Sequence, residues 1–95
     1  MPEFEPEELM TWTGGAWSTR PSGRISGFSY DTRLLRKAEG FVALKTERRD
    51  GHDFLDSAEK AGASMALVER EVREAKLPQL RVDDSWKALQ TLATR

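Results

Sequence analysis

The sequence has 95 residues, and although 33% of them are charged, the formal net charge is only −1. A chain of this length forms one small domain, and its balanced charge argues against a general nucleic-acid binder or a protein drawn to anionic membranes. The chain has no cysteine, no membrane-spanning apolar run and an acidic start, "MPEFEPEELM", unlike a signal peptide; these features exclude disulfides and thiolate metal sites and favour a cytoplasmic protein.

The first half of the chain predicts one helix and two strands. Residues 6–13 are expected to form a short helix, because Pro6 suits the first helical position and Gly14 follows its end. After a loop rich in helix breakers, residues 25–30 are predicted to form a strand. Residues 41–45 form a second strand, whose continuous apolar run is typical of a strand covered on both faces.

The second half predicts two helices around two further strands. Residues 52–62 have apolar side chains at helical spacing, with Asp50 or His52 as the candidate cap at the start. Strands are expected at residues 64–69 and 79–84. Residues 84–95 form the last predicted helix, whose apolar face is expected to hold Trp86, Leu89 and Leu92 or Ala93.

These elements follow the order helix, strand, strand, helix, strand, strand, helix. Continuous apolar strands separated by an amphipathic helix indicate an α/β protein with a largely parallel sheet. We therefore predict a small three-layer α/β domain with a mostly parallel or mixed sheet.

Polar loops follow the first two predicted strands. The first loop contains Tyr30, Asp31, Thr32 and Arg33, and the second contains Thr46, Glu47, Arg48 and Arg49. Ligands bind at the carboxyl ends of strands in open α/β sheets, so the two loops are expected to lie side by side if the strands are parallel neighbours. Their guanidinium and hydroxyl groups, with N–H groups at the next helix start, suit a phosphate or diphosphate. Judged by spacing alone, the alternative is that these charged loop residues are simply exposed to solvent and bind no ligand.

Other kinds of site receive little support from the sequence. His52 is the only histidine, and without cysteine it cannot anchor a multi-histidine zinc site, so we expect it to pack at a helix start. No G-x-x-x-x-G-K-[ST] loop occurs. The three tryptophans are expected in the core or at an interdomain contact rather than in a stacking platform; they are Trp12, Trp17 and Trp86.

Several motifs together resemble one family. "YDTR", then "GFVALKTERRDGHDFLDSAEKAGASMALVE", then "LRVDDSWKALQTLATR" resemble, in order and spacing, the N-terminal domain of the Mur ligases of peptidoglycan synthesis. The ending and the early "TGG" look more like the MurF branch, which joins D-alanyl-D-alanine to UDP-N-acetylmuramoyl-tripeptide. The MurE branch, which adds the third amino acid, and a non-catalytic interaction module with the same fold remain alternatives.

The resemblance implies a role and a site for this domain. It implies that residues 30–33 and 46–49 contact the UDP part of UDP-N-acetylmuramoyl-peptide, and that Asp50, Gly51 and His52 form a structural turn. It implies no catalytic residue, metal or cofactor in this fragment. ATP and magnesium would belong to the central domain of a bacterial, cytoplasmic parent enzyme, and that domain and a C-terminal domain would be the partners within the same chain.

The chain departs from the family pattern in two places. Lys37-Ala38-Glu39 stands where the family often has Pro-Gly-Asp, so the turn before the second strand is expected to be rebuilt or looser. Thr46 stands where the family usually has glycine, and it is expected to alter the diphosphate contact.

Overall fold

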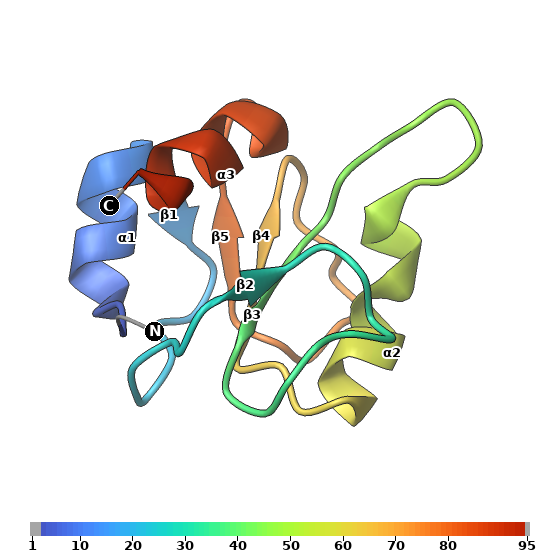
Figure 1. The fold of residues 1–95 in the computed structure, drawn as a ribbon, viewed down its shortest axis with the longest axis horizontal. Helices are drawn as coiled ribbons and strands as arrows, with labels where there is room; N and C mark the ends of the chain where they lie inside the picture. Colours follow the sequence, from blue (N-terminus) through green and yellow to red (C-terminus); the bar gives the residue numbers. More distant parts are fainter. Residues whose placement is uncertain (1–2, 95) are drawn as a thin grey trace.

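The computed structural model describes residues 3–94, which fold into one five-stranded sheet flanked by helices (Figure 1). The strands are β1 (Ala16–Trp17), β2 (Phe28–Ser29), β3 (Gly40–Val42), β4 (Met65–Val68) and β5 (Gln79–Arg81). The helices are α1 (Pro6–Thr13), the 3₁₀ helix η1 (Gly51–Phe54), α2 (Leu55–Lys60) and α3 (Ser85–Ala93). This confirms the predicted α/β class.

The sheet has the strand order β1-β5-β4-β3-β2. Strands β2, β3, β4 and β5 run parallel to one another, whereas β1 pairs with β5 in the antiparallel direction. The prediction of a mostly parallel or mixed sheet is therefore confirmed. One consequence matters for the site. Because β2 and β3 are parallel neighbours, both strands end at the same edge of the sheet.

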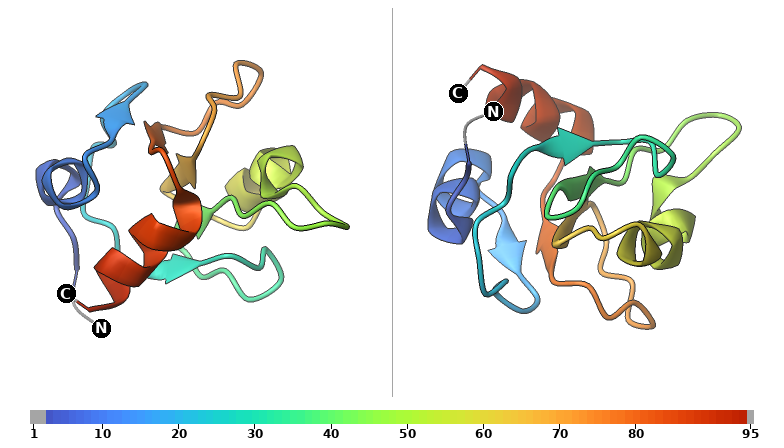
Figure 2. Two further views of the ribbon diagram at one scale, coloured as in Figure 1. Left: turned by 90° about the horizontal axis from the view of Figure 1, so that it is seen from above. Right: turned by 60° about the horizontal axis from the view of Figure 1, so that its bottom comes forward.

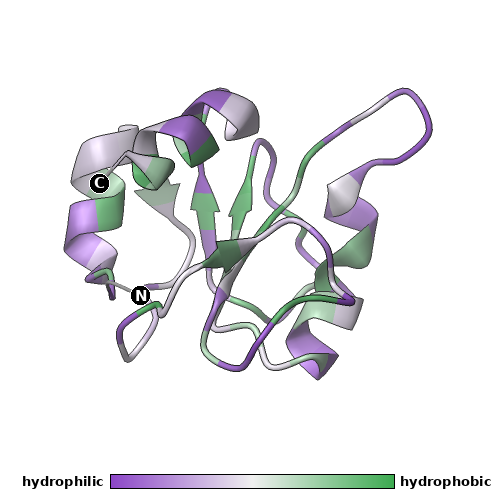
Figure 3. Ribbon diagram, in the orientation of Figure 1, coloured by the Kyte–Doolittle hydropathy of each residue, from purple (hydrophilic) through white to green (hydrophobic). Residues whose placement is uncertain are grey.

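Helices cover both faces of the sheet, which gives the predicted three layers (Figures 1 and 2). Successive residues of a strand point to opposite faces, and β3 shows this division clearly. Val42 belongs to the apolar cluster that contains Leu9 of α1 and Leu92 of α3. Phe41 belongs to a second cluster, which contains Leu55 of α2. The central strands are consequently hydrophobic on both sides, while the charged residues gather in the loops and on the outer helix faces (Figure 3).

Helix α1 begins and ends at the residues that the sequence indicated. Pro6 takes the first helical position, and Glu5 and Glu8 form a reciprocal capping box at the start. Gly14 follows the last helical residue, Thr13; it has φ +71° and donates its N–H to the carbonyl of Met10 at 2.9 Å. Leu9 is fully buried against the sheet, which anchors the helix.

The helix predicted over residues 52–62 starts as η1 and continues as α2. Of the two candidate caps, Asp50 takes the role: its carboxylate accepts the backbone N–H of His52. Leu55 and Ala58 are buried, as their spacing predicted. Gly62 follows the helix with φ +99°, a conformation that glycine adopts at little steric cost.

Two predictions about strands need correction. Strand β1 was not predicted; its two residues pair with β5. Just before β1, the backbone at Gly15 lies so close to β5 that an added Cβ would be 2.7 Å from the Arg81 carbonyl oxygen. The strand predicted over residues 25–30 is confined to β2, because Ile25 instead pairs with Phe4 in an isolated antiparallel bridge. Both differences arise from pairing with segments far away in the sequence.

The predicted apolar face of α3 is confirmed at Leu92 and in part at Leu89, but it is wrong at Trp86. Ser85, Ala88 and Leu92 are buried, and Leu89 packs partly against the same cluster. Trp86, which was expected on this face, is 52% exposed, and Ala93 is exposed as well. Trp86, Leu89 and Leu92 follow helical spacing almost as well as the buried residues Ser85, Ala88 and Leu92 do. Spacing alone therefore did not show which set faces the core.

The turn before β3, which was expected to be rebuilt or looser, is closed by hydrogen bonds. Glu39 donates its N–H to the Arg36 carbonyl at 3.1 Å, and Ala38 has φ +71° at the third turn position, where such turns require a positive φ. Ala38 also donates its N–H to Gly62 and accepts from the hydroxyl of Ser64. These bonds hold an alanine in a conformation that is unfavourable for it.

Replacing Ala38 by glycine should stabilise the fold. The left-handed conformation costs an L-residue about 1–2 kcal/mol, and part of that is returned through the greater freedom of glycine in the unfolded chain, so we expect a gain of about 0.5–1 kcal/mol. Urea unfolding of both proteins measures the change. Ala61→Gly is the matched control: Ala61 has an ordinary φ of −78°, and glycine should destabilise the protein there. A loss of stability in Ala38→Gly would contradict this account.

Candidate functional site

A pocket of about 470 Å³ lies where β2 and β3 end. Its walls come from the loop after β2, the loop after β3, the start of η1 and the first turn of α3. The lining residues are Tyr30, Asp31, Thr32, Arg33, Phe41, Leu44, Thr46, Arg49, Gly51, Phe54 and Trp86. The position at the carboxyl ends of parallel strands is the usual place for a ligand in an open α/β sheet.

The register of β2 against β3 explains why the two loops meet. Phe28 pairs with Gly40 and Ser29 with Phe41, so the chain leaves both strands at nearly the same level. Residues 30–33 and part of the second loop, Thr46 and Arg49, then line one pocket, as do residues of the turn that follows.

Not every predicted site residue reaches the pocket. Glu47 and Arg48 are exposed at the tip of the second loop and do not line it. Asp50 and His52 lie behind the pocket wall, where they hold the turn together, while Gly51 between them lines the pocket.

The first loop carries an internal ion pair. Asp31 accepts two hydrogen bonds from the guanidinium of Arg33, at 3.1 Å from Nε and 2.9 Å from Nη2, and a third from its backbone N–H at 2.9 Å. These bonds from Arg33 lower the pKa of Asp31 to about 2. Arg33 therefore already has an anionic partner, which any phosphate would have to replace or share.

The second loop is closed by Thr46. Its backbone N–H donates to the Arg49 carbonyl at 2.6 Å, and its hydroxyl oxygen accepts the N–H of Arg49 at 3.1 Å. Thr46 does not have a positive φ, so this turn does not need the glycine of the family pattern. The guanidinium of Arg49 lies 5.6 Å from the ring centre of Phe54, which places a cation beside an aromatic ring at the pocket.

The N–H groups at the helix start, expected to serve a phosphate, are already bonded within the protein. Gly51 donates to the carbonyl of Leu44 at 2.7 Å, His52 to the carboxylate of Asp50 at 3.0 Å, and Asp53 to the carbonyl of Asp50 at 3.0 Å. The turn uses these three donors to fix its own shape, so a phosphate would have to compete for them. The cationic side chains and hydroxyl groups of the loops are left as the groups that can meet an anion.

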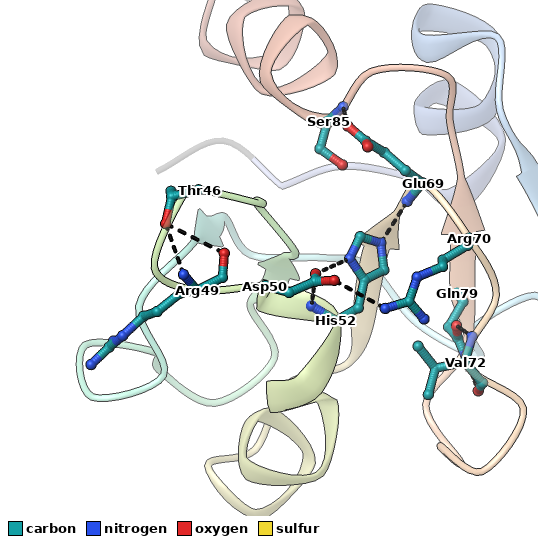
Figure 4. A network of polar contacts seen from close by, with 9 residues as sticks. All are labelled: Thr46, Arg49, Asp50, His52, Glu69, Arg70, Val72, Gln79 and Ser85. Atoms are coloured by element: carbon teal, nitrogen blue, oxygen red, sulfur yellow. Dashed lines mark hydrogen bonds and ion pairs between the residues drawn. The ribbon is translucent and has the colours of Figure 1, made fainter.

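A buried histidine joins this turn to the end of β4 (Figure 4). His52 is 5% exposed; its Nε2 accepts the N–H of Glu69 at 2.9 Å, so Nδ1 carries the proton and donates to Asp50 at 2.6 Å. Arg70 donates to the other oxygen of Asp50 at 3.0 Å. Burial raises the pKa of Asp50, but the hydrogen bonds from His52 and Arg70 outweigh it and bring the pKa to about 2.

Four lining residues were not predicted as site residues: Phe41, Leu44, Phe54 and Trp86. Phe41, Leu44 and Phe54 were assigned to strand and helix cores, and they reach the pocket because it opens directly onto the apolar layer. Trp86 lies 37 residues beyond Arg49, and only the fold brings α3 to this edge of the sheet. One signal could have indicated Trp86. It lies in the first turn of the helix that follows β5, and β5 is parallel to β4, so this helix starts at the same edge of the sheet as the two loops.

Neither a metal site nor a membrane-spanning helix is found within residues 3–94. No group of three or more histidine, aspartate or glutamate side chains is arranged to hold a metal ion. In the same range, no helix is long and apolar enough to cross a membrane.

Comparisons with known proteins agree on one family. A family model described as "Mur ligase family, catalytic domain" matches residues 24–95. The UDP-N-acetylmuramoyl-tripeptide–D-alanyl-D-alanine ligase of Escherichia coli is 49% identical over 69 residues, which cover 73% of this chain and 15% of that protein. The UDP-N-acetylmuramoyl-L-alanyl-D-glutamate–2,6-diaminopimelate ligase of Aquifex aeolicus is 39% identical over 66 residues, which cover 70% and 14%.

A solved structure extends the similarity over nearly the whole chain. The structure of MurF from Acinetobacter baumannii superposes with a TM-score of 0.89 and 32% sequence identity, covering 97% of this chain and 20% of that one. The chain thus spans a fifth or less of the length of each of these relatives.

Proposed function

This chain belongs to the Mur ligase family, and from that premise we propose that it binds the uridine-diphosphate end of UDP-N-acetylmuramoyl-tripeptide for a MurF-type enzyme. The observation that carries the proposal is the pocket after β2 and β3, which combines aromatic side chains with the hydroxyl of Thr32 and the cation of Arg49. A nucleoside diphosphate offers a flat ring and an anionic group at one end of one molecule, which fits this combination.

The MurF branch is favoured over the MurE branch by two comparisons. Identity is higher to the D-alanyl-D-alanine ligase of Escherichia coli, at 49%, than to the diaminopimelate ligase of Aquifex aeolicus, at 39%. The MurF structure from Acinetobacter baumannii also matches 97% of the chain. We accordingly propose the tripeptide-bearing precursor as the ligand of the parent protein.

The chemistry of ligation is assigned to other domains of the parent protein. As the resemblance implies, a central domain would bind ATP and magnesium, and with a C-terminal domain it would join D-alanyl-D-alanine to the tripeptide in the bacterial cytoplasm. This chain would hold the distant end of the substrate, so that binding energy from the nucleotide positions the reacting carboxylate. A G-x-x-G-K-[ST] loop encoded shortly after residue 95 would support this arrangement.

A titration with UDP tests the proposed function. We expect millimolar UDP to shift the backbone amide NMR signals of residues 30–33 and 46–51 in the ¹⁵N-labelled chain. Arg49→Ala should weaken binding about tenfold, because a hydrogen bond to a charged group contributes about 1.5–3 kcal/mol. Arg48→Ala, which removes the same charge from the adjacent exposed position, should have a much smaller effect.

Arg73→Ala is the neutral control, because Arg73 is exposed in the loop between β4 and β5, away from the pocket. Shifts that are absent at millimolar UDP, or that are spread evenly over the surface, would contradict the proposed function. An equal loss of affinity in Arg48→Ala and Arg49→Ala would show that UDP senses the general charge of the loop rather than this pocket.

A further inference from the structure

Two exposed aromatic side chains touch at the mouth of the pocket. Tyr30 is 62% exposed and Trp86 is 52% exposed, and their ring centres lie 6.5 Å apart at an angle of 44°. Both line the pocket. An indole and a phenol that remain this exposed forgo much of the stabilisation that burial gives to large aromatic rings, so a ligand that covers them gains it.

The position of Trp86 is fixed by bonds on either side of it. Ser85 donates its N–H to the Glu69 carboxylate at 2.8 Å, and Lys87 donates its N–H to the Asp84 carboxylate at 3.1 Å. The next turn of α3 is anchored by Ala88, which is buried in the core. The backbone that carries the indole is therefore held in place before any ligand arrives, which lowers the entropy cost of binding.

The pocket is also lined by two arginines. Arg49 lies beside Phe54, and Arg33 is held by Asp31 on the loop that also carries Tyr30. A ligand that fills the whole pocket would present a flat ring to the aromatic pair and an anion to the guanidinium of Arg49. This polarity gives the ligand one orientation, with its ring toward α3 and its phosphates toward the second loop.

We propose that Trp86, with Tyr30, forms the stacking surface for the base of the nucleoside diphosphate that this pocket binds. The inference rests on the proposed function and adds to it a residue from α3, outside the two loops that the sequence indicated. Stacking a base on an aromatic side chain typically accounts for about 5- to 150-fold in affinity by alanine substitution. Trp86→Ala should therefore weaken UDP binding about tenfold, whereas Trp86→Phe, which keeps an aromatic face, should weaken it less than about threefold.

Base-specific and phosphate-specific probes separate stacking from other effects. UDP should quench the tryptophan fluorescence of the original chain and leave that of Trp86→Phe nearly unchanged, since Trp12 and Trp17 remain as partly buried reporters. Pyrophosphate, which has no base, should bind the original chain and Trp86→Ala equally. Leu34→Ala is the matched control, because Leu34 is 71% exposed but does not line the pocket.

The possible results distinguish a failure of the stacking role from a failure of the proposed function. If UDP shifts residues 30–33 and 46–51 but Trp86→Ala binds it as tightly as the original chain, the stacking role is wrong and the proposed function stands. If UDP does not bind the chain, both are wrong. If Trp86→Ala loses affinity for pyrophosphate as strongly as for UDP, the indole supports the shape of the pocket and does not stack on the base. Amide spectra of each variant confirm that the fold is retained.

Discussion

Gly51→Ala should lower the free energy of unfolding by about 3 kcal/mol, at the upper end of what overpacking a core costs. An added Cβ at Gly51 would lie 2.6 Å from the Leu44 nitrogen, 2.8 Å from the Ala43 Cα and 2.9 Å from the Leu44 oxygen. All three are backbone atoms, so no side chain can rotate away to make room. Relief would require the chain after β3 to separate from the start of η1, which breaks the 2.7 Å hydrogen bond from Gly51 to Leu44.

Thermal unfolding measures this effect, and a loss of about 3 kcal/mol corresponds to a fall in Tm of more than about 10 °C for a domain of this size. Gly23→Ala is the matched control, because nothing lies within 4 Å of an added Cβ there and its φ is not in the left-handed region. That control should change stability by less than about 0.5 kcal/mol. Equal Tm values for the two variants would show that the close approach at Gly51 relaxes at little cost. In Gly51→Ala, UDP binding should also weaken, because Gly51 lines the pocket.

His52→Ala should cost a similar amount, about 3 kcal/mol, through a different mechanism. The imidazole is the only link that the structure shows, in the part of the chain it describes, between the carboxylate of Asp50 and the N–H of Glu69. Its removal leaves the Glu69 donor without its partner, takes one hydrogen bond from Asp50 and opens a cavity in a site that is 5% exposed. Urea unfolding measures the loss, and Asp53→Ala, at the exposed neighbouring position, should be nearly neutral.

A double-mutant cycle with Asp50→Ala isolates the contribution of the pair. At neutral pH the coupling energy should be favourable, since the Asp50 carboxylate is ionised. The hydrogen bonds to it hold its pKa at about 2 in the folded protein, below the ordinary value of 3.8. Its contribution to stability is therefore present above about pH 4 and is lost as the pH falls toward 2. A coupling energy near zero at neutral pH, or one that grows on acidification, would contradict the network.

The strongly patterned parts of the fold were predictable from the sequence. The apolar run at residues 64–69 contains β4, the spacing of Leu55 and Ala58 gave the buried face of α2, and the glycine after α1 marked its end. These signals are local, because each depends on residues within one element. Strand β1 could not be found in this way, since its two residues are defined by pairing with β5, more than 60 residues away.

The position of the pocket was predictable in outline, but the residues that line it were not all predictable, for the same reason. Because parallel strands end at the same edge of a sheet, residues 30–33 and the second loop were expected to lie together. The parallel pairing of β2 with β3 provides that arrangement. Arg49 lines the pocket and Arg48 does not, although both are exposed; this difference depends on the turn that Thr46 closes and not on spacing in the sequence. The contribution of Trp86 depends on where α3 crosses the sheet edge, and its helical spacing favoured the core instead.

The sheet has outer strands of only two residues each, β1 at one side and β2 at the other. An edge strand presents unpaired N–H and C=O groups that can recruit a strand from another molecule, and long flat edges are where such aggregation begins. Here the fully buried apolar strands β3 and β4 are enclosed between neighbouring strands. The sides of the sheet therefore offer little for a second chain to pair with, and we expect the domain not to polymerise through its sheet edges at high concentration.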